Sequence, residues 1–306
     1  MRLKLGRPDL DRYADRLDVR PATGGLGVTF LGVASLLLDD GESAVMTDGF
    51  FSRPSLRKVV LGKVAPNPGR IDAALARVRV ERLDAVVPVH THFDHAMDSA
   101  AVAERTGAAL VGGCSAAYVG RGLGLPEDRI QVVTPGVPLS FGTFTLTLVE
   151  SRHCPPDRFP GVIDEPVVPP ARASAYRCGE AWSVLVEHSS GRSALLQGSA
   201  GFGPGALTGR RADVAYLGVG QLGVRGRDYI RSYWAETVTA VGARRVVLTH
   251  WDDFFRPLDR TLRALPYAGD DLDVTMSVLG DLAQRQDVAL HLPTLWRRED
   301  PWAGLG

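Results

Sequence analysis

The stretch PVHTHFDHAMD, residues 88–98, places the strongest constraint on how this chain folds. It holds three of the chain's seven histidines and two aspartates within eleven positions. The run DAVVPVH, residues 84–90, leads into it and is short and rich in valine, as buried strands are. The fold must therefore carry several metal-ligating side chains to the end of one strand.

The spacing within this stretch predicts two neighbouring metal positions. In an extended segment His90 and His92 point to the same side, whereas Asp94 and His95 begin the next turn and face an adjacent position. A single histidine at a strand end is more often an ordinary hydrogen-bonded surface residue. Four ligand-type residues within six positions are much better explained as a metal site.

The remaining pattern predicts one α/β domain over residues 1–306, without internal repeats. Strand-like runs and helical periodicity alternate along the chain, and glycine turns at Gly142 and Gly191 each join two apolar segments into a hairpin. The strand-like runs include residues 27–40, 43–51, 84–90, 108–113 and 243–250, and the helical patterns cover residues 70–83, 96–107 and 270–286.

A proline-rich loop insertion at residues 155–178 interrupts this pattern. Residues 153–179 contain six prolines and show no periodicity. A loop of this length inside a domain usually forms a lid or a wall of a site, so we expect it to cover the metal centre. Four arginines lie in or beside the loop and are candidates to receive an anionic substrate, although solvated surface arginines explain them equally well: Arg152, Arg158, Arg172 and Arg177.

Composition excludes several classes of function. Thirty-five basic and thirty-five acidic residues give a formal net charge of zero, which does not supply the positive field that nucleic acid binding requires. No apolar run approaches the roughly 18 residues of a membrane span, and the N-terminal stretch lacks the apolar core of a secretory signal. Three cysteines at unrelated spacings argue against a disulfide framework. We therefore expect a cytoplasmic protein with no membrane span, of unspecified oligomeric state.

The motif HTHFDH resembles the His-X-His-X-Asp-His motif of the metallo-β-lactamase superfamily. Further family positions are matched by Asp48 in VMTDGFFS, His153 in VESRHCP and His250 in VVLTHWDDF. Together with TFLGVASLLL, these segments look most like the branch that includes ascorbate-6-phosphate lactonase. The resemblance implies a four-layer αββα sandwich, with a metal site at one edge formed by the loops between strands.

The resemblance also implies a set of ligands. One ion would be held by His90, His92 and His153, and a second by Asp94, His95 and His250. The first set leaves one coordination position open, which is how zinc activates water. Asp48 would support the ligand histidines by hydrogen bonding to their second nitrogens. Zinc is the expected metal, with one or two ions per chain, and manganese or iron are alternatives.

One position departs from the family pattern. The family places a bridging aspartate where this chain has Ser199 in ALLQGSAG. A hydroxyl is neutral and a weak ligand, so the second ion loses a negative charge and a shared anchor. Asp252 and Asp253, just beyond His250, are candidate substitutes, and Asp213 is expected to be a cap or a surface residue. Cys154, His188 and His291 are expected to be structural residues.

These residues predict a metal-dependent hydrolase that acts on a small molecule. The metal would activate water for attack on an ester, a lactone or a phosphodiester, with Asp94 orienting that water or accepting its proton. The alternative is a non-catalytic protein on the same fold that binds a metal or an anionic ligand. The five histidines at motif positions and the intact Asp94 argue against that alternative.

Overall fold

Strand β2 (Leu36–Asp39) shows how the chain builds its layers. In the computed structural model, which describes residues 4–305, Leu36 and Leu38 pack into the core between two sheets. Leu37 packs on the other face, into a core beneath the outer helices. Successive side chains of a strand point to opposite faces, so an unbroken apolar run requires a sheet that is covered on both sides.

The first sheet has seven strands in the order β14-β1-β2-β3-β4-β5-β6. The neighbours from β14 to β3 pair antiparallel, and those from β3 to β6 pair parallel. Besides β2, its strands are β1 (Gly27–Phe30), β3 (Ala44–Thr47), β4 (Ala85–Val87), β5 (Ala109–Gly112), β6 (Ile130–Val132) and β14 (Arg298–Glu299).

The second sheet also has seven strands, in the order β13-β12-β11-β10-β9-β8-β7. Here too one half is antiparallel, from β7 to β10, and the other is parallel, from β10 to β13. Its strands are β7 (Pro138–Phe141), β8 (Phe144–Ser151), β9 (Ala181–His188), β10 (Ser193–Gln197), β11 (Val214–Gly218), β12 (Arg245–Thr249) and β13 (Ala289–His291).

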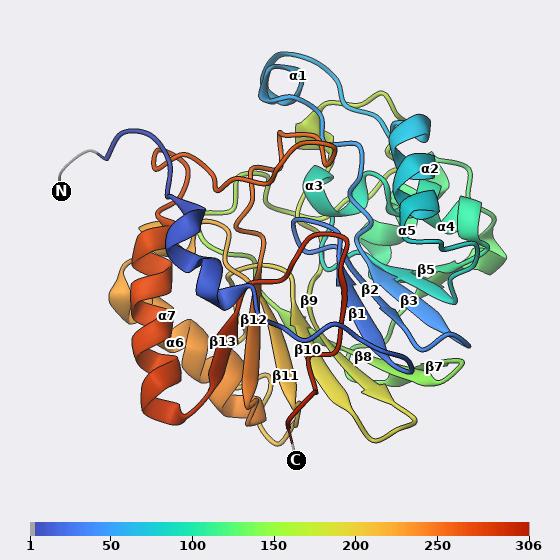
Figure 1. The fold of residues 1–306 in the computed structure, drawn as a ribbon. Coiled ribbons are helices and arrows are strands. Elements are labelled where there is room, and N and C mark those ends of the chain that lie inside the picture. Colours follow the sequence, from blue (N-terminus) through green and yellow to red (C-terminus); the bar gives the residue numbers. More distant parts are fainter. Residues whose placement is uncertain (1–3, 306) are drawn as a thin grey trace.

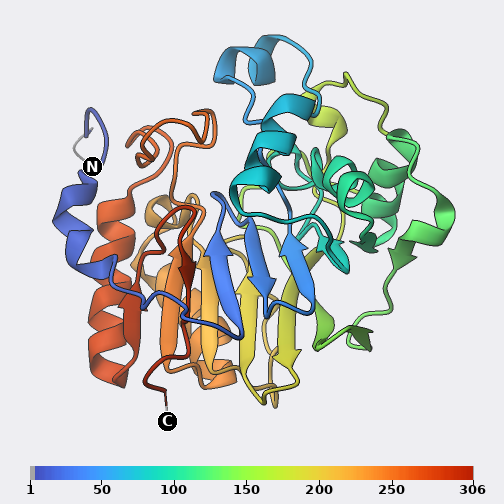
Figure 2. The ribbon, with the colours of Figure 1, turned by 45° about the vertical axis from the view of Figure 1, so that its right-hand side comes forward.

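Helices cover the outer faces of both sheets (Figures 1 and 2). Those on the first sheet are α2 (Pro68–Arg77), α4 (Ser99–Thr106) and α5 (Cys114–Gly122), while α1 (Leu56–Leu61) and the short α3 (Phe93–Ala96) lie above the strands in Figure 1. On the second are α6 (Arg227–Trp234), continued by a π-helical turn, and α7 (Leu272–Gln286). Short 3₁₀ helices lie at Leu10–Arg16, Glu127–Arg129, Ala173–Ala175 and Leu222–Val224. The predicted αββα layer order is confirmed.

The ends of several strands meet at one edge of the sandwich. In the second sheet β8, β10 and β12 run in the same direction, so their carboxyl ends lie at a common edge. In the first sheet β3 and β4 are parallel and end together. Every residue predicted to form the site follows one of these five strands within a few positions or belongs to α3 after β4.

The glycine turns agree with the sequence, whereas one helix differs in its bounds. Gly142 and Gly191 have φ values of 58° and 83°, as the two predicted hairpin turns require, and Gly107 ends α4 with φ 76°. The helix expected over residues 70–83 is shorter and ends at Arg77. Buried residues from Val19 to Trp302 share one core, and the assignment of residues 1–306 to one domain remains a prediction. Residues 1–3 and 306 lie outside the described part.

A buried ion pair ties the two halves of the chain together behind the site edge. Nη2 of Arg53 lies 2.7 Å from Oδ2 of Asp252, and both side chains are fully buried. The other oxygen of Asp252 accepts a hydrogen bond from the backbone N–H of Val33 at 2.9 Å. The carbonyl of Val33 in turn accepts from the N–H of His250 at 2.6 Å. The pair therefore braces the backbone that carries His250.

Replacing Asp252→Ala should lower the free energy of unfolding by about 3–5 kcal/mol, because it leaves the Arg53 guanidinium buried without its partner. Chemical denaturation followed by circular dichroism measures this change. The control is Asp228→Ala, which breaks an exposed pair with Arg231 and should cost less than about 1 kcal/mol. Equal losses in the two variants would contradict a bracing role for the buried pair.

Candidate metal centre

The segment after β4 carries four ligand-type side chains, two on extended backbone and two on a short helix. His90 and His92 lie on the extended stretch, and His92 is the residue that precedes α3. Asp94 and His95 lie on α3 itself, so they face a neighbouring direction. All four side chains are buried. The local structure thus agrees with the expected division of the motif into two pairs.

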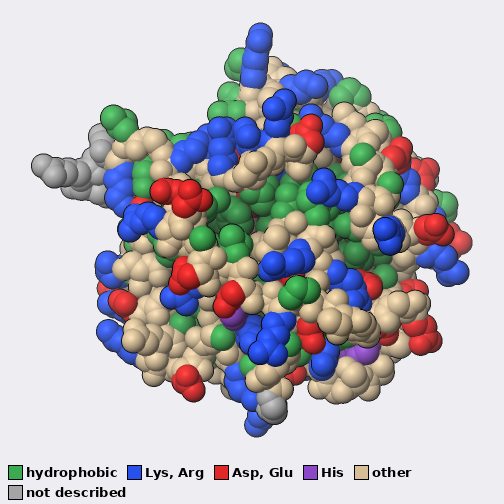
Figure 3. Space-filling view, in the orientation of Figure 1, with side chains coloured by type: hydrophobic (Ala, Val, Ile, Leu, Met, Phe, Trp, Pro, Cys, Tyr) green, Lys and Arg blue, Asp and Glu red, His purple; other side chains and the backbone are tan. Residues whose placement is uncertain are grey.

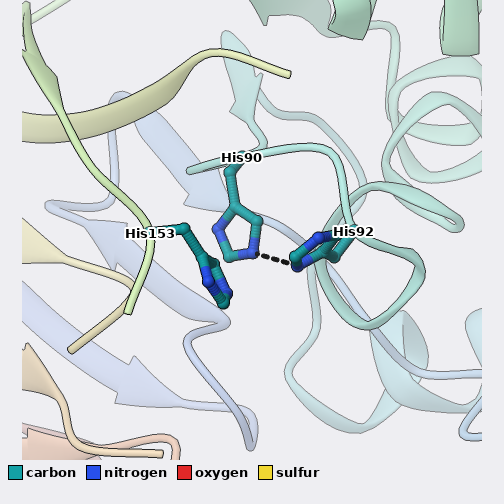
Figure 4. Close-up of side chains that lie close together, drawn as sticks. All are labelled: His90, His92 and His153. Carbon is teal, nitrogen blue, oxygen red and sulfur yellow. Dashed lines mark hydrogen bonds between the residues drawn. The ribbon is translucent and has the colours of Figure 1, made fainter. Parts of the chain in front are cut away.

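The first cluster consists of His90, His92 and His153, whose rings converge from two segments of the chain (Figure 4). Nε2 of His90 lies 3.1 Å from Nδ1 of His92. His153 follows β8, and its ring centroid lies 4.8 Å from that of His90 and 4.6 Å from that of His92. One donor atom from each residue lies within 4.8 Å of the others.

The second cluster consists of Asp94, His95 and His250. Nε2 of His95 lies 3.2 Å from Nε2 of His250. Oδ2 of Asp94 lies 3.7 Å from the first of these nitrogens and 3.4 Å from the second. The ring centroids of His90 and His95 are 3.9 Å apart, so the two clusters adjoin each other.

Two of these histidines have a hydrogen-bond partner on the nitrogen that faces away from the cluster, and the third, His92, has a carboxylate in ion-pair contact there. Nδ1 of His95 lies 2.8 Å from Oδ2 of Asp48, as the sequence analysis expected of that residue. Nδ1 of His153 lies 2.7 Å from the carbonyl oxygen of Cys154, and Nε2 of His92 lies 3.0 Å from Oδ1 of Asp157. An outward N–H that donates to oxygen leaves the inward nitrogen as a lone-pair donor, which is the tautomer a metal requires.

Burial disfavours protonation of two rings in the first cluster. Burial, followed by the charges of neighbouring imidazoles, lowers the pKa of His90 well below its usual range. Burial and the charge of His92 lower the pKa of His153 to about 4. Both rings are therefore unprotonated near neutral pH, and their nitrogens are free to coordinate an ion.

The second cluster contains an ionised carboxylate, Asp94. Burial would raise the pKa of the Asp94 carboxyl, but the charge of His95 and the hydrogen bond with His250 outweigh burial and lower it. Burial also opposes protonation of His250, yet the hydrogen bond with Asp94 raises its pKa. Asp94 is consequently an ionised carboxylate that attracts positive charge to this position.

The donor sets fit divalent metal ions. Ligands at about 2.0–2.1 Å around a tetrahedral zinc ion are about 3.3 Å from one another. The nitrogen pairs at 3.1 and 3.2 Å, and the oxygen–nitrogen pairs at 3.4 and 3.7 Å, lie close to that spacing. Two facing lone pairs at such distances repel each other unless a cation or a proton lies between them. Imidazole nitrogen and carboxylate oxygen are also the ligand types that zinc, manganese and iron accept.

Ser199 lies beside the first cluster, at the end of β10. Its hydroxyl oxygen accepts a hydrogen bond from the N–H of Cys154 at 2.9 Å, next to His153. The preceding residue is Gly198, where an added Cβ would lie only 2.1 Å from Cγ2 of Val89. This contact holds β10 close to the residue before His90. The sequence departure therefore falls at the site, as expected.

The two aspartates considered as substitutes for the missing bridge are engaged elsewhere. Asp252 pairs with buried Arg53. Asp253 pairs with Arg7 at 3.0 Å and with Arg263 at 2.9 Å. Their carboxylates are therefore neutralised by arginines, and neither belongs to a three-residue donor cluster among residues 4–305.

The other polar candidates also lie outside the clusters. The carboxylate of Asp213 accepts hydrogen bonds from the backbone and hydroxyl of Ser193, which fits the expected capping role. His188 pairs with Asp40 at 2.9 Å. The Cys154 thiol is packed in the protein, where burial raises its pKa to about 12.

His291 lies in β13 and pairs with Asp18 at 2.6 Å, so it too has a partner away from the site.

Asp157 is the residue that sequence reasoning missed. It belongs to the proline-rich loop, and its carboxylate contacts the outward nitrogen of His92. Burial would raise its pKa, but the hydrogen bond with His92 and nearby histidine charges lower the pKa of Asp157 to about 2. Its position four residues after His153 was the only available signal.

Two of the loop arginines lie at a depression of their own. Arg172 and Arg177 line a depression of about 510 Å³, together with Lys63 and residues 162–168 and 170–171, and none of the clustered histidines lines it. Arg152 and Arg158 are exposed.

Part of the chain is similar in sequence to known proteins. Residues 28–171 match the model of the metallo-β-lactamase superfamily. The chain is similar to a UPF0173 metal-dependent hydrolase of Anaeromyxobacter sp. (strain K), with 28% identity over 138 residues, which is 44% of this chain and 45% of that protein. The chain thus spans less than half the length of the curated relatives it matches.

Solved structures show the same architecture. The crystal structure of a possible metal-dependent hydrolase from Veillonella parvula DSM 2008 has a TM-score of 0.54 at 15% identity, and the match covers 90% of this chain and 99% of that one. The metallo-β-lactamase fold protein YhfI from Bacillus subtilis has a TM-score of 0.50 at 14% identity, over 90% and 97% of the two chains. The fold is therefore the metallo-β-lactamase fold, and residues 28–171, just under half of the chain, are similar in sequence to the metallo-β-lactamase superfamily.

Proposed function

We propose that this chain is a metal-dependent hydrolase that cleaves a small-molecule ester, lactone or phosphodiester. The observation that carries the proposal is the adjacency of two three-donor clusters at one edge of the sandwich. The names of the curated relatives, metal-dependent hydrolases, support the same class of activity. Zinc is the proposed metal because three imidazoles with one remaining position suit its tetrahedral preference, and manganese or iron would also accept these ligands.

We assign His90, His92 and His153 to a first metal position and Asp94, His95 and His250 to a second. A divalent ion bound there lowers the pKa of a coordinated water and polarises a substrate oxygen.

The protein's own residues fix the geometry of that reaction. Asp48 orients His95, and the Cys154 carbonyl orients His153, so neither ring can rotate without breaking a hydrogen bond. Asp94 is the only carboxylate among the six proposed ligands. Because its pKa is lowered, it is ionised and accepts hydrogen bonds, which suits it to orient the attacking water.

The proposed substrate class is set by the chemistry of an activated water. A water activated in this way would suit the carbonyl carbon of an ester or lactone and the phosphorus of a phosphodiester alike. The resemblance to the lactonase branch favours the first group. Figure 3 shows lysine and arginine side chains over the upper part of one face, near α1, which favours an anionic substrate of either kind. Nucleic acid is not proposed, since the formal net charge is zero.

The proposal also includes a cytoplasmic location, which the three free cysteines support. Among the described residues, no helix is both long and apolar enough to cross a membrane. The competing hypothesis is a metal- or anion-binding protein without turnover, and it differs from the proposal in its lack of any metal-dependent hydrolysis.

Activity should appear when chromogenic ester, lactone and bis-phosphodiester substrates are offered with added zinc or manganese. The expected result is hydrolysis of at least one class that a chelator removes and the metal restores. The substrate class that is cleaved separates the two branches of the proposal. Stoichiometric metal binding with no hydrolysis in any arm would favour the binding protein instead.

Replacing His90→Ala should remove the metal at the first position without unfolding the protein. A large core does not depend on a metal at its edge, in contrast to a zinc finger. Metal analysis after dialysis and thermal unfolding of the same samples test this expectation. The matched control is His291→Ala, a histidine paired with Asp18 away from the clusters, which should keep the wild-type metal content. Wild-type metal content in His90→Ala would refute the ligand assignment.

Replacing Ser199→Asp should raise metal occupancy at the second position. Asp94, His95 and His250 bring one formal negative charge to a divalent ion, so we expect wild-type protein to retain between one and two equivalents through dialysis. A carboxylate at position 199 adds a second charge and should bring the content close to two. The control is Ser199→Asn, which has a similar size without the charge. Two full equivalents in the wild type, unchanged by Ser199→Asp, would show that the missing charge is not needed.

A further inference from the structure

Asp157 links the proline-rich loop to the first metal cluster. Oδ1 of Asp157 lies 3.0 Å from Nε2 of His92, and the side chains are 23% and 8% exposed. The opposite nitrogen of the same ring, Nδ1, lies 3.1 Å from Nε2 of His90. The imidazole of His92 thus stands between a loop carboxylate on one side and the cluster on the other.

This arrangement determines which nitrogen of His92 can bind a metal. A carboxylate on Nε2 keeps a proton on that nitrogen, and a neutral ring then has its lone pair on Nδ1. Without the carboxylate the ring is free to place its proton on Nδ1, which would abolish coordination toward His90. We propose that Asp157 is a positioning residue that holds His92 ready for the metal, and that the loop and the first metal stabilise each other through it. This inference rests on the proposed metal centre.

Hydrogen bonds made by loop residues that follow Asp157 also attach the loop to the motif. The N–H of Phe159 donates to Oδ1 of Asp157 at 3.0 Å, and the carbonyl of Phe159 accepts from the N–H of Cys178 at 2.8 Å. The carbonyl of Cys178 accepts from the N–H of Thr91 at 2.8 Å. A chain of contacts therefore runs from His92 through the loop and back to the residue next to His92.

These contacts couple loop conformation to metal binding. If the loop contact increases the affinity of the metal by some factor, then the metal must favour the closed loop by the same factor. Asp48 and the Cys154 carbonyl act on His95 and His153 from beside β3 and β8, whereas Asp157 acts from a loop of more than 20 residues. Of these three outward contacts, the one to His92 is the contact that depends on the position of the loop.

A competing interpretation treats Asp157 as a ligand. Donor atoms of His92, Asp157 and Cys178 lie within 4.8 Å of one another and could hold an ion of their own. That ion would need Nε2 of His92 while the first metal needs Nδ1, so the ring would have to lose both of its protons. The positioning role requires no such step, and it differs in the number of ions bound.

The test measures zinc affinity by competition with a chelator in Asp157→Ala, Asp157→Asn and Asp164→Asn. Removing an outer hydrogen-bond partner of a metal-bound histidine typically costs 10–100-fold in affinity, so Asp157→Ala should bind the first zinc about 10–100-fold more weakly. Asp157→Asn keeps an oxygen acceptor without the charge and should lose less. Asp164 is exposed in the same loop, and Asp164→Asn should match the wild type. Thermal unfolding of the metal-free proteins verifies that all variants are folded.

Limited proteolysis of the loop provides a readout that is independent of activity. Zinc should slow cleavage within residues 155–178 in the wild type and in Asp164→Asn. In Asp157→Ala the same protection should be much smaller, at zinc concentrations that saturate the metal site of every variant. Absence of zinc binding in the wild type would remove the proposed metal centre and this inference together. Unchanged affinity and protection in Asp157→Ala, with wild-type zinc binding intact, would refute the inference alone. An additional zinc equivalent that Cys178→Ser removes would show that Asp157 is a ligand.

Discussion

Packing of the two sheets against each other determines where every site residue lies. Because both faces of each sheet are buried, the strands cannot shift register without exposing an apolar row such as Leu36 and Leu38 or Leu37. The carboxyl ends of β4, β8, β10 and β12 are therefore held at one edge. Gly198 against Val89 shows how close the sheets come there, since the space admits no Cβ. The metal centre is assembled by this packing and not by local sequence alone.

The hydrogen bonds that face away from the clusters explain how an assembly of imidazoles can be ready for metal. Asp48, the Cys154 carbonyl and Asp157 each take one ring nitrogen and leave the other for coordination. These partners come from two distant parts of the chain, Asp48 after β3 and the pair Cys154 and Asp157 after β8. Several segments at this edge of the sandwich therefore orient the ligands together. The buried Arg53–Asp252 pair also supports the backbone of His250.

Ser199 and Asp157 together give this centre its particular balance of charge. The position where the family pattern has a bridging carboxylate is a hydroxyl bonded to the Cys154 N–H, so Asp94 is the only carboxylate in the two clusters. Asp157 adds a second carboxylate, but on the outer side of His92, where it acts through the ring. The negative charge beside the first position is therefore supplied by a loop and not by a strand end.

The sequence by itself was enough to predict the αββα fold class through family resemblance, the two glycine hairpin turns and the division of HTHFDH into an extended pair and a helical pair. These features depend on residue spacing and on backbone preferences, which act locally. Only the tertiary structure revealed the contacts of Asp157 and the engagement of Asp252 and Asp253 by arginines. It also showed that Arg172 and Arg177 line a depression that none of the clustered histidines lines. Those outcomes depend on which distant segments pack together. The role of a carboxylate is set by the side chain that it contacts, and its position in the sequence does not specify that side chain.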